Sequence, residues 1–244
     1  MKTLAIIQAH MGSSRLPGKV LMDLAGKTAL ERVVERTRRC HEIDEVLVAT
    51  SSLRMDDDIE AACQKMNVPV YRGSNSDVLD RFAQAARQHR ADVCVRITSD
   101  CPLIDPEVSA HIVHSFREMP GVDYASNKIP QSYPRGLDTE VFTREALELA
   151  WTEAKAPYQR AHVTIYIYEH PERFALRSVT SAVDRADWRW TVDTIEDLEF
   201  VRTVYERLGP EGNFGWQDVL TLLEHEPNLR TINQHVRQKE VREG

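Results

Sequence analysis

The 244-residue sequence predicts an α/β fold, in which a mostly parallel sheet is covered by helices on both faces. Two observations support this prediction. Short runs of Val, Ile and Leu alternate with segments of helical spacing over residues 1–120. Strands buried on both faces read as continuous apolar runs, and helices between consecutive strands permit parallel pairing. No repeat or clear linker interrupts the chain, so we expect one domain over residues 1–244, with a polar tail (about 236–244) that frays.

The first half of the chain predicts four strand–helix pairs. In the helix at 29–40 the apolar residues recur on one face. The helix at 105–119 is expected to begin with Asp105 as N-cap and Pro106 in its first turn. The expected strands are 3–9, 45–51, 68–72 and 92–98, and the expected helices are 29–40, 56–66, 76–89 and 105–119.

The pattern is less regular after about residue 120. Residues 162–170 fit either a helix or a strand. In the expected strand at 187–193, Trp188 and Trp190 share a face, which favours packing in the core or an interface over stacking on a sugar. The other expected strands are 122–127, 137–142 and 173–179, and the expected helices are 143–154, 194–208 and 216–227.

Composition limits the function classes. The net charge of −7 disfavours broad electrostatic binding to nucleic acid. No apolar run approaches the roughly 20 residues that span a bilayer, and the N-terminus lacks signal-peptide features, so we expect a cytoplasmic protein without a membrane partner. The four cysteines form no CxxC pair, and Cys40, Cys63 and Cys94 are expected to be small core residues.

The segment HMGSSRLPGKV, residues 10–20, follows the first strand as a phosphate-binding loop would. It is not a Walker A loop, because five residues separate Gly12 from Gly18 and Val20 follows Lys19 where Ser or Thr is required. Glycines let backbone N–H groups approach an anion, while Arg15 offers a planar fork and Lys19 a compact ammonium. The alternative is an ordinary strand-to-helix connection with two solvated cations.

Two aspartates lie near the expected ends of strands, where ligands bind in open α/β sheets. Asp100 follows the strand at 92–98, and Asp193 ends the segment at 187–193. Mg²⁺ prefers one or two carboxylates together with phosphate oxygens. Each aspartate could instead cap a turn or helix. Together with the loop, the two carboxylates favour nucleotidyl transfer assisted by Mg²⁺.

Several motifs together resemble the cytidylyltransferase family, which includes CMP-sugar synthetases, and especially its branch named after a spore coat polysaccharide biosynthesis protein. The resemblance runs from residue 3 to about 208. It rests on QAHMGSSRLPGK, VLVATS, SDVLDRF, RITSDCPLIDP, YPRGLDTEVF, PYQRAHVTIYIY and WTVDTIEDLEFV.

The resemblance implies a three-layer α/β/α sandwich of the nucleotide-diphospho-sugar transferase type. It also implies transfer of CMP from CTP to an acidic sugar, of 2-keto-3-deoxy or nonulosonic type, with release of pyrophosphate, and a homodimer. Arg15, Lys19 and Asp100 would be catalytic, and Asp100 and Asp193 would hold Mg²⁺. Residues implied to bind nucleotide are Gln8, Ala9, Gly12, Ser13, Ser14, Arg15, Lys19, Thr50, Arg81 and Asp100; those implied to bind the acceptor are Asp138, Glu140 and His162.

Some alternatives remain open at this point. Arg81 could be a solvent-facing helix residue, and His162 a core or capped histidine. The acidic run at 56–58 fits a solvated helix start. As an Asp-x-Asp metal motif it would instead suggest a glycosyltransferase that uses a nucleotide-sugar donor. A third possibility is a nucleotide-binding subunit without turnover.

Overall fold

The computed structural model describes residues 1–239, in which seven strands form one mixed sheet in the order β3-β2-β1-β4-β6-β5-β7. The first four strands of this order are parallel, with Ile6 beside Leu47 and Arg96 in the register. Strand β6 is antiparallel to both β4 and β5, and β7 is parallel to β5. The strands are β1 Thr3–Gln8, β2 Glu45–Ser51, β3 Val70–Gly73, β4 Val93–Thr98, β5 Tyr124–Ser126, β6 Glu140–Thr143 and β7 Leu176–Ser178.

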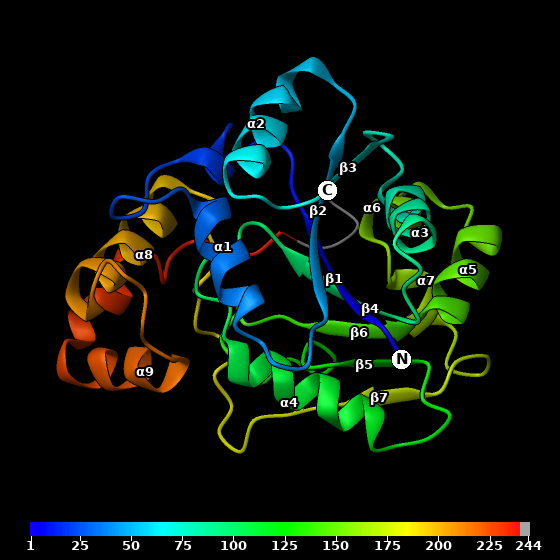
Figure 1. Ribbon diagram of the computed structural model, residues 1–244. Helices are drawn as coiled ribbons and strands as arrows, with labels where there is room; N and C mark the ends of the chain where they lie inside the picture. Colours follow the sequence, from blue (N-terminus) through cyan, green and yellow to red (C-terminus); the bar gives the residue numbers. More distant parts are fainter. Residues whose placement is uncertain (240–244) are drawn as a thin grey trace.

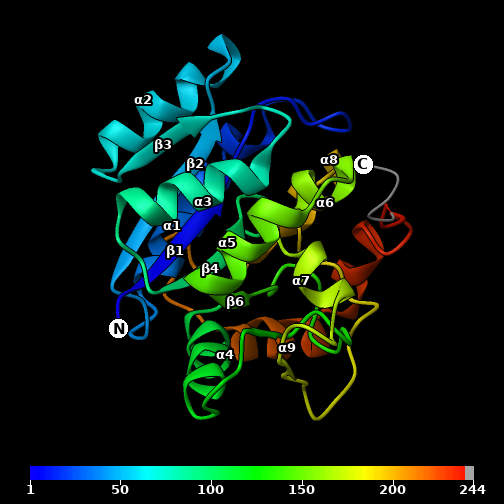
Figure 2. The same ribbon diagram turned by 90° about the vertical axis from the view of Figure 1, so that its right-hand side faces the viewer.

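Helices cover both faces of this sheet, which confirms the predicted three-layer α/β/α arrangement (Figure 1). One apolar cluster joins the sheet to α1, α2, α4, α8 and α9, and a second joins its other face to α3, α5 and α7. Figure 2 shows α3 and α5 in front of the strands from the side. The α-helices are α1 Ala29–Arg38, α2 Asp57–Lys65, α3 Val78–Gln88, α4 Pro106–Arg117, α5 Arg144–Glu153, α6 Pro157–His162, α7 Ile165–Glu169, α8 Ile195–Leu208 and α9 Trp216–His225, and the 3₁₀ helices are η1 Lys19–Leu21, η2 Arg54–Asp56 and η3 Pro227–Ile232.

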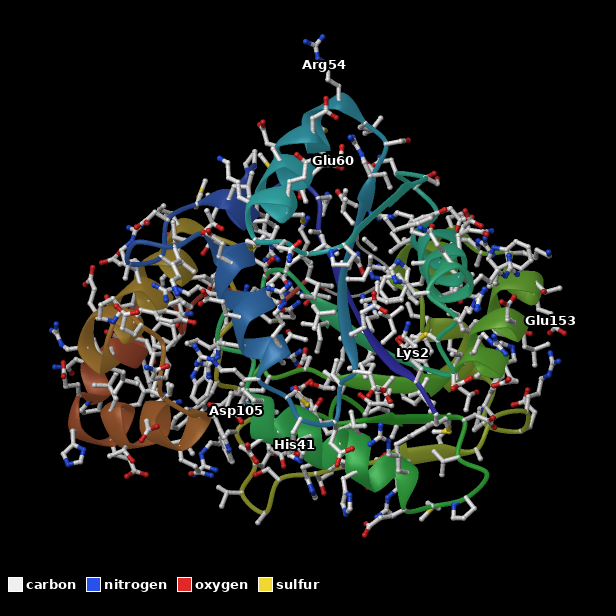
Figure 3. All side chains as sticks on the ribbon, viewed as in Figure 1. Lys2, His41, Arg54, Glu60, Asp105 and Glu153 are labelled. Carbon is white, nitrogen blue, oxygen red and sulfur yellow. The ribbon has the colours of Figure 1, made fainter. Side chains whose placement is uncertain are left out.

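Helix caps confirm several boundaries. The Asp105 carboxylate accepts hydrogen bonds from the N–H groups of Glu107 and Val108 at the start of α4. Its other oxygen accepts from the N–H of Trp216 at 2.8 Å, so this carboxylate, labelled in Figure 3, also fixes the start of α9. Thr143 caps α5 by accepting a hydrogen bond from the N–H of Ala146. None of the helices in residues 1–239 has the length and apolar character needed to cross a membrane.

Two segments differ from their predicted structure. Residues 187–193 form no strand: Arg135 bonds to Trp188 and Trp190 through a single isolated bridge, and the Trp190 ring is buried against its neighbours. Gly136 permits this approach, because a Cβ atom there would lie 2.6 Å from the backbone of Trp190. The ambiguous segment 162–170 contains the end of α6 and all of α7, which are separated by Val163, whose φ is +63°, and Thr164.

Part of the predicted polar tail contacts the loop that follows β1. The hydrogen bonds run from Arg15 to the carbonyl of Arg237 and from Lys239 to Ser14. The remainder of the predicted tail, residues 240–244, lies outside the described residues.

Candidate active site

The loop after β1 is held in shape by its own backbone and by Asp56. The N–H of Gly18 bonds to the carbonyl of Met11, and Gly18 has the left-handed φ of +73°. A carboxylate oxygen of Asp56 accepts from the N–H of Met11 at 2.7 Å, while the other contacts Ser51. Asp56 is therefore buried, and the interpretation of the acidic run as a solvated helix start is wrong for this residue, although Asp58 is exposed. Figure 3 shows that Arg54, two residues away, projects into solvent.

Lys19 lies at the floor of the site and joins the two predicted metal ligands. Its ammonium donates to Asp193 Oδ1 at 2.7 Å, to Asp100 Oδ2 at 3.0 Å and to the carbonyl of Val192 at 2.8 Å. Residues from three distant parts of the sequence thus meet at one nitrogen atom. Since the side chain is only 7% exposed, these three contacts give each ammonium proton a partner away from water.

Asp193 contacts two further cations. Arg15 lies 2.7 Å and Arg189 2.6 Å from Asp193 Oδ2, and Arg189 also pairs with Asp197 at 2.8 Å. We call these three cations and three carboxylates the ion-pair cluster: Arg15, Lys19, Arg189, Asp100, Asp193 and Asp197. Asp193 is not the N-cap of α8, because Thr194 caps this helix in a capping box with Asp197. The capping alternative for Asp193 is therefore wrong.

Burial and charge act in opposite directions on these groups. Burial would raise the pKa of Asp100, but the Lys19 ammonium outweighs it and lowers that pKa below its usual range. Burial likewise works against charge on Lys19, yet Asp100 and Asp193 raise its pKa. The pKa of His10 is lowered by burial and by the nearby Lys19. At neutral pH the aspartate and lysine are charged, and His10 is a neutral imidazole.

A cavity of about 530 Å³ opens over the ion-pair cluster. We call one group of its lining residues, from the loop after β1, the ion-pair cluster and the tail, the phosphate end: Gly12, Ser13, Ser14, Arg15, Lys19, Asp100, Asp193, Gln238 and Lys239. We call a second group of lining residues the acceptor end: Arg96, Lys128, Arg135, Gly136, Asp138 and His162. The structure thus places nine of the residues predicted for the site at this cavity: Gly12, Ser13, Ser14, Arg15, Lys19, Asp100, Asp138, His162 and Asp193.

The other predicted nucleotide-binding residues lie behind the cavity wall. Ala9 and Thr50 are fully buried in the sheet, and Gln8 accepts a hydrogen bond from Arg96 at 3.1 Å. Arg81 is only 2% exposed and donates to the carbonyl of Ala49, so its solvent-facing alternative is wrong. None of these four side chains lines the cavity in the described part of the chain.

Glu140, predicted to bind the acceptor, is buried and holds Arg96 beside the cavity. It forms an ion pair with Arg96 and accepts hydrogen bonds from Tyr124 at 2.8 Å and Thr164 at 2.6 Å. Burial alone would raise its pKa, but Lys128 and Arg96 lower the pKa of Glu140 to about 2. The carboxylate is therefore ionised, and both of its oxygen atoms have partners among Arg96, Tyr124 and Thr164.

Sequence reasoning did not identify the cations Arg96, Lys128, Arg135 and Arg189 or the tail residue Lys239. Arg96 could have been identified from the sequence, because an arginine inside the apolar run VCVRIT requires a buried partner for its charge. Arg189 lies in a segment that was predicted as a strand. Lys239 lies in the part that was predicted to fray.

The fold and the cavity lined by Lys19, Asp100 and Asp193 fit a nucleotidyltransferase, and comparison with known proteins gives the class and the family. The chain belongs to the cytidylyltransferase family, whose model matches residues 4–213. It is 34% identical to the spore coat polysaccharide biosynthesis protein SpsF of Bacillus subtilis, over 93% of this chain and 96% of that protein. It is 39% identical to an uncharacterized protein of Methanocaldococcus jannaschii, over 100% of this chain and 99% of that protein.

Two other similarities extend this result. A 3-deoxy-manno-octulosonate cytidylyltransferase of an Anaeromyxobacter species is 35% identical, over 67% of this chain and 71% of that protein. The solved structure of a cytidylyltransferase from Leptospira borgpetersenii superposes with a TM-score of 0.91 at 32% identity, covering 98% of this chain and 100% of that one. The resemblance to the cytidylyltransferases and to their spore coat branch is therefore confirmed.

Proposed function

We propose that the chain transfers CMP from CTP to an acidic sugar of the 2-keto-3-deoxy or nonulosonic type, for the synthesis of a surface polysaccharide. The observation that carries this proposal is the Lys19 ammonium, which bonds to both Asp100 and Asp193 beneath the loop. Two carboxylates that share one nitrogen lie within reach of one small cation. That donor set fits Mg²⁺, which completes its shell with phosphate oxygens and water.

The loop and its two cations would bind the triphosphate of CTP. Arg15 can hold two phosphate oxygens in its planar fork, and Lys19 offers a compact positive charge. When bound, Mg²⁺ would neutralise the phosphates and the developing charge on the leaving pyrophosphate. The acceptor hydroxyl oxygen forms a bond to the α-phosphorus, the bond from that phosphorus to the bridging oxygen breaks, and pyrophosphate leaves.

The hydroxyl proton of the acceptor needs a base. Three carboxylates line the cavity in the described residues, and two of them are committed to the metal in this proposal. Asp138 is the third, and we infer that it accepts the proton. Its pKa is raised by burial, which makes it a stronger base than an exposed aspartate.

The acceptor end supports an acidic substrate. Arg96, Lys128 and Arg135 line it, although Glu140 neutralises Arg96. Lys128 lies 3.9 Å from Glu140, and its side chain is about one-third exposed. A carboxylate on the acceptor would meet these cations as it entered the cavity. The name of the Anaeromyxobacter relative specifies such an acceptor, 3-deoxy-manno-octulosonate, and the name of the Bacillus relative specifies polysaccharide biosynthesis.

Pyrophosphate release tests the proposal. We expect release with CTP, Mg²⁺ and at least one sugar from a panel of 2-keto-3-deoxy and nonulosonic acids, and background rates with the other three nucleoside triphosphates. The Asp100→Asn variant should fold and lose activity, whereas the exposed Asp58→Asn should keep it. Background release with every sugar acid would contradict the acceptor class, and full activity of Asp100→Asn would contradict the metal assignment.

The alternatives predict other outcomes. A glycosyltransferase would need the acidic run as a metal motif, but Asp56 is engaged with the loop and Asp57 pairs with Arg72 at 2.7 Å. Neither residue lines the cavity. A nucleotide-binding subunit without turnover would bind CTP in calorimetry and release no pyrophosphate with any acceptor.

A further inference from the structure

The C-terminal tail is fixed to the back of the ion-pair cluster. After η3 the chain passes Asn233, a residue that is only 3% exposed. Its amide donates to the carbonyl of Arg189 at 3.0 Å and to Asp197 Oδ1 at 2.9 Å. A buried amide with two partners is a firm attachment point. The tail is thus attached to the residues that support Asp193.

From this attachment point the tail reaches the loop after β1. Arg189 donates to the side-chain oxygen of Gln238 at 2.6 Å, and Arg15 donates to the carbonyl of Arg237 at 3.4 Å. Lys239 then donates to Ser14 Oγ at 3.2 Å, across 225 positions of sequence. Lys239 and Gln238 both line the phosphate end of the cavity. The tail therefore forms part of the cavity wall.

The charges at this end give Lys239 a particular role. In the ion-pair cluster three positive and three negative charges cancel, since each cation faces a carboxylate. Lys239 contacts a neutral hydroxyl and forms no ion pair with a carboxylate of residues 1–239. Among the described residues that line the phosphate end, Lys239 is thus the cation without a carboxylate partner. A triphosphate brings about four negative charges to this end.

We propose that Lys239 is a further nucleotide-binding residue, which contacts the outer phosphates of CTP from the C-terminal tail. This inference rests on the proposed function. The α-phosphate must lie deep in the cavity, where the acceptor can reach it, and buried Lys19 marks that depth. Lys239 and Ser14 lie at the exposed mouth. The phosphates that leave as pyrophosphate therefore lie beside Lys239.

Calorimetric titration with CTP and CMP tests this role without requiring turnover. The variant Lys239→Gln should weaken CTP binding about two- to fivefold at low salt, as expected for one exposed charge contact. Binding of CMP should not change, because CMP lacks the outer phosphates. Lys239→Arg should restore CTP binding, and the difference should shrink at about 0.5 M salt. The matched control is Lys65→Gln, which removes an exposed lysine at the end of α2, away from the cavity.

The outcomes separate this inference from the proposed function. If the unchanged protein binds no CTP, the proposed function fails and takes this inference with it. If it binds CTP and Lys239→Gln binds equally well, only the role of Lys239 is wrong. Equal weakening of CTP and CMP would overturn the assignment to the outer phosphates. Tighter CTP binding by Lys239→Gln would show that the tail obstructs the site, which also overturns the proposal.

Discussion

Asp193→Asn is the most direct test of the ion-pair cluster, because it removes one charge and keeps the shape of the side chain. Asp193 lies within 2.7 Å of Lys19, Arg15 and Arg189. Without its charge, Lys19 keeps Asp100 at 3.0 Å and Arg189 keeps Asp197 at 2.8 Å. Two of the three cations thus retain a carboxylate partner.

The remaining pairs set the expected size of the effect. Removing one partner from a buried ion pair costs about 3–5 kcal/mol when the other charge is left alone. Since most of the charge here stays paired, we expect the free energy of unfolding to fall by about 2 kcal/mol. For a chain of this length that corresponds to a melting temperature lower by about 4–8 °C.

Thermal unfolding followed by circular dichroism, without nucleotide, measures this change. Asp58→Asn is the control, since its side chain is exposed on α2. The same Asp193→Asn protein should show no Mg²⁺-dependent release of pyrophosphate. An unchanged melting temperature would refute the stabilising role of the cluster, and retained Mg²⁺-dependent activity would refute the role of Asp193 at the metal.

Three further changes test other parts of the structure. Asp138→Asn should lower the rate of pyrophosphate release at least tenfold and abolish the acid limb of the pH–rate profile. Burial raises the pKa of Asp138. As the pH falls, the unchanged enzyme should therefore lose activity at a higher pH than it would with an ordinary aspartate, whose pKa is about 3.9. Glu140→Gln should lower the free energy of unfolding in urea by about 3–5 kcal/mol, because buried Arg96 loses its partner; adding Arg96→Met should recover part of it. Asp56→Ala should weaken CTP binding by freeing the N–H of Met11, and CTP affinity equal to the unchanged protein would contradict this role of Asp56.

The fold could be predicted because local periodicity decides most of it. The helix at 29–40 shows the outcome, since its apolar face packs in the core as α1. Where the local sequence pattern predicted the wrong structure, contacts between residues distant in the sequence determined the observed one. Trp188 and Trp190 alternate as in a strand, but within residues 1–239 their segment forms only an isolated bridge with Arg135, and Trp190 is buried in the core. Alternation alone does not distinguish these two arrangements.

The candidate site was predictable where it follows strand ends. Arg15, Lys19 and Asp100 could be grouped because the carboxyl ends of parallel strands share an edge of the sheet. Arg189 could not be found in this way, since its role depends on ion pairs with Asp193 and Asp197. Lys239 depends on a contact across nearly the whole chain, which no local pattern encodes.

In the ion-pair cluster, residues expected to bind ligands of opposite charge, phosphate and Mg²⁺, contact one another. The cations suited to phosphate neutralise the carboxylates suited to Mg²⁺, so that neither set is buried without a partner. A triphosphate alone would draw Arg15 and Lys19 away and leave the aspartates unpaired. A metal ion alone would leave the cations unpaired. Under the proposed function, nucleotide and metal bound together would exchange one set of ion pairs for another, so we expect the site to favour binding of the two together.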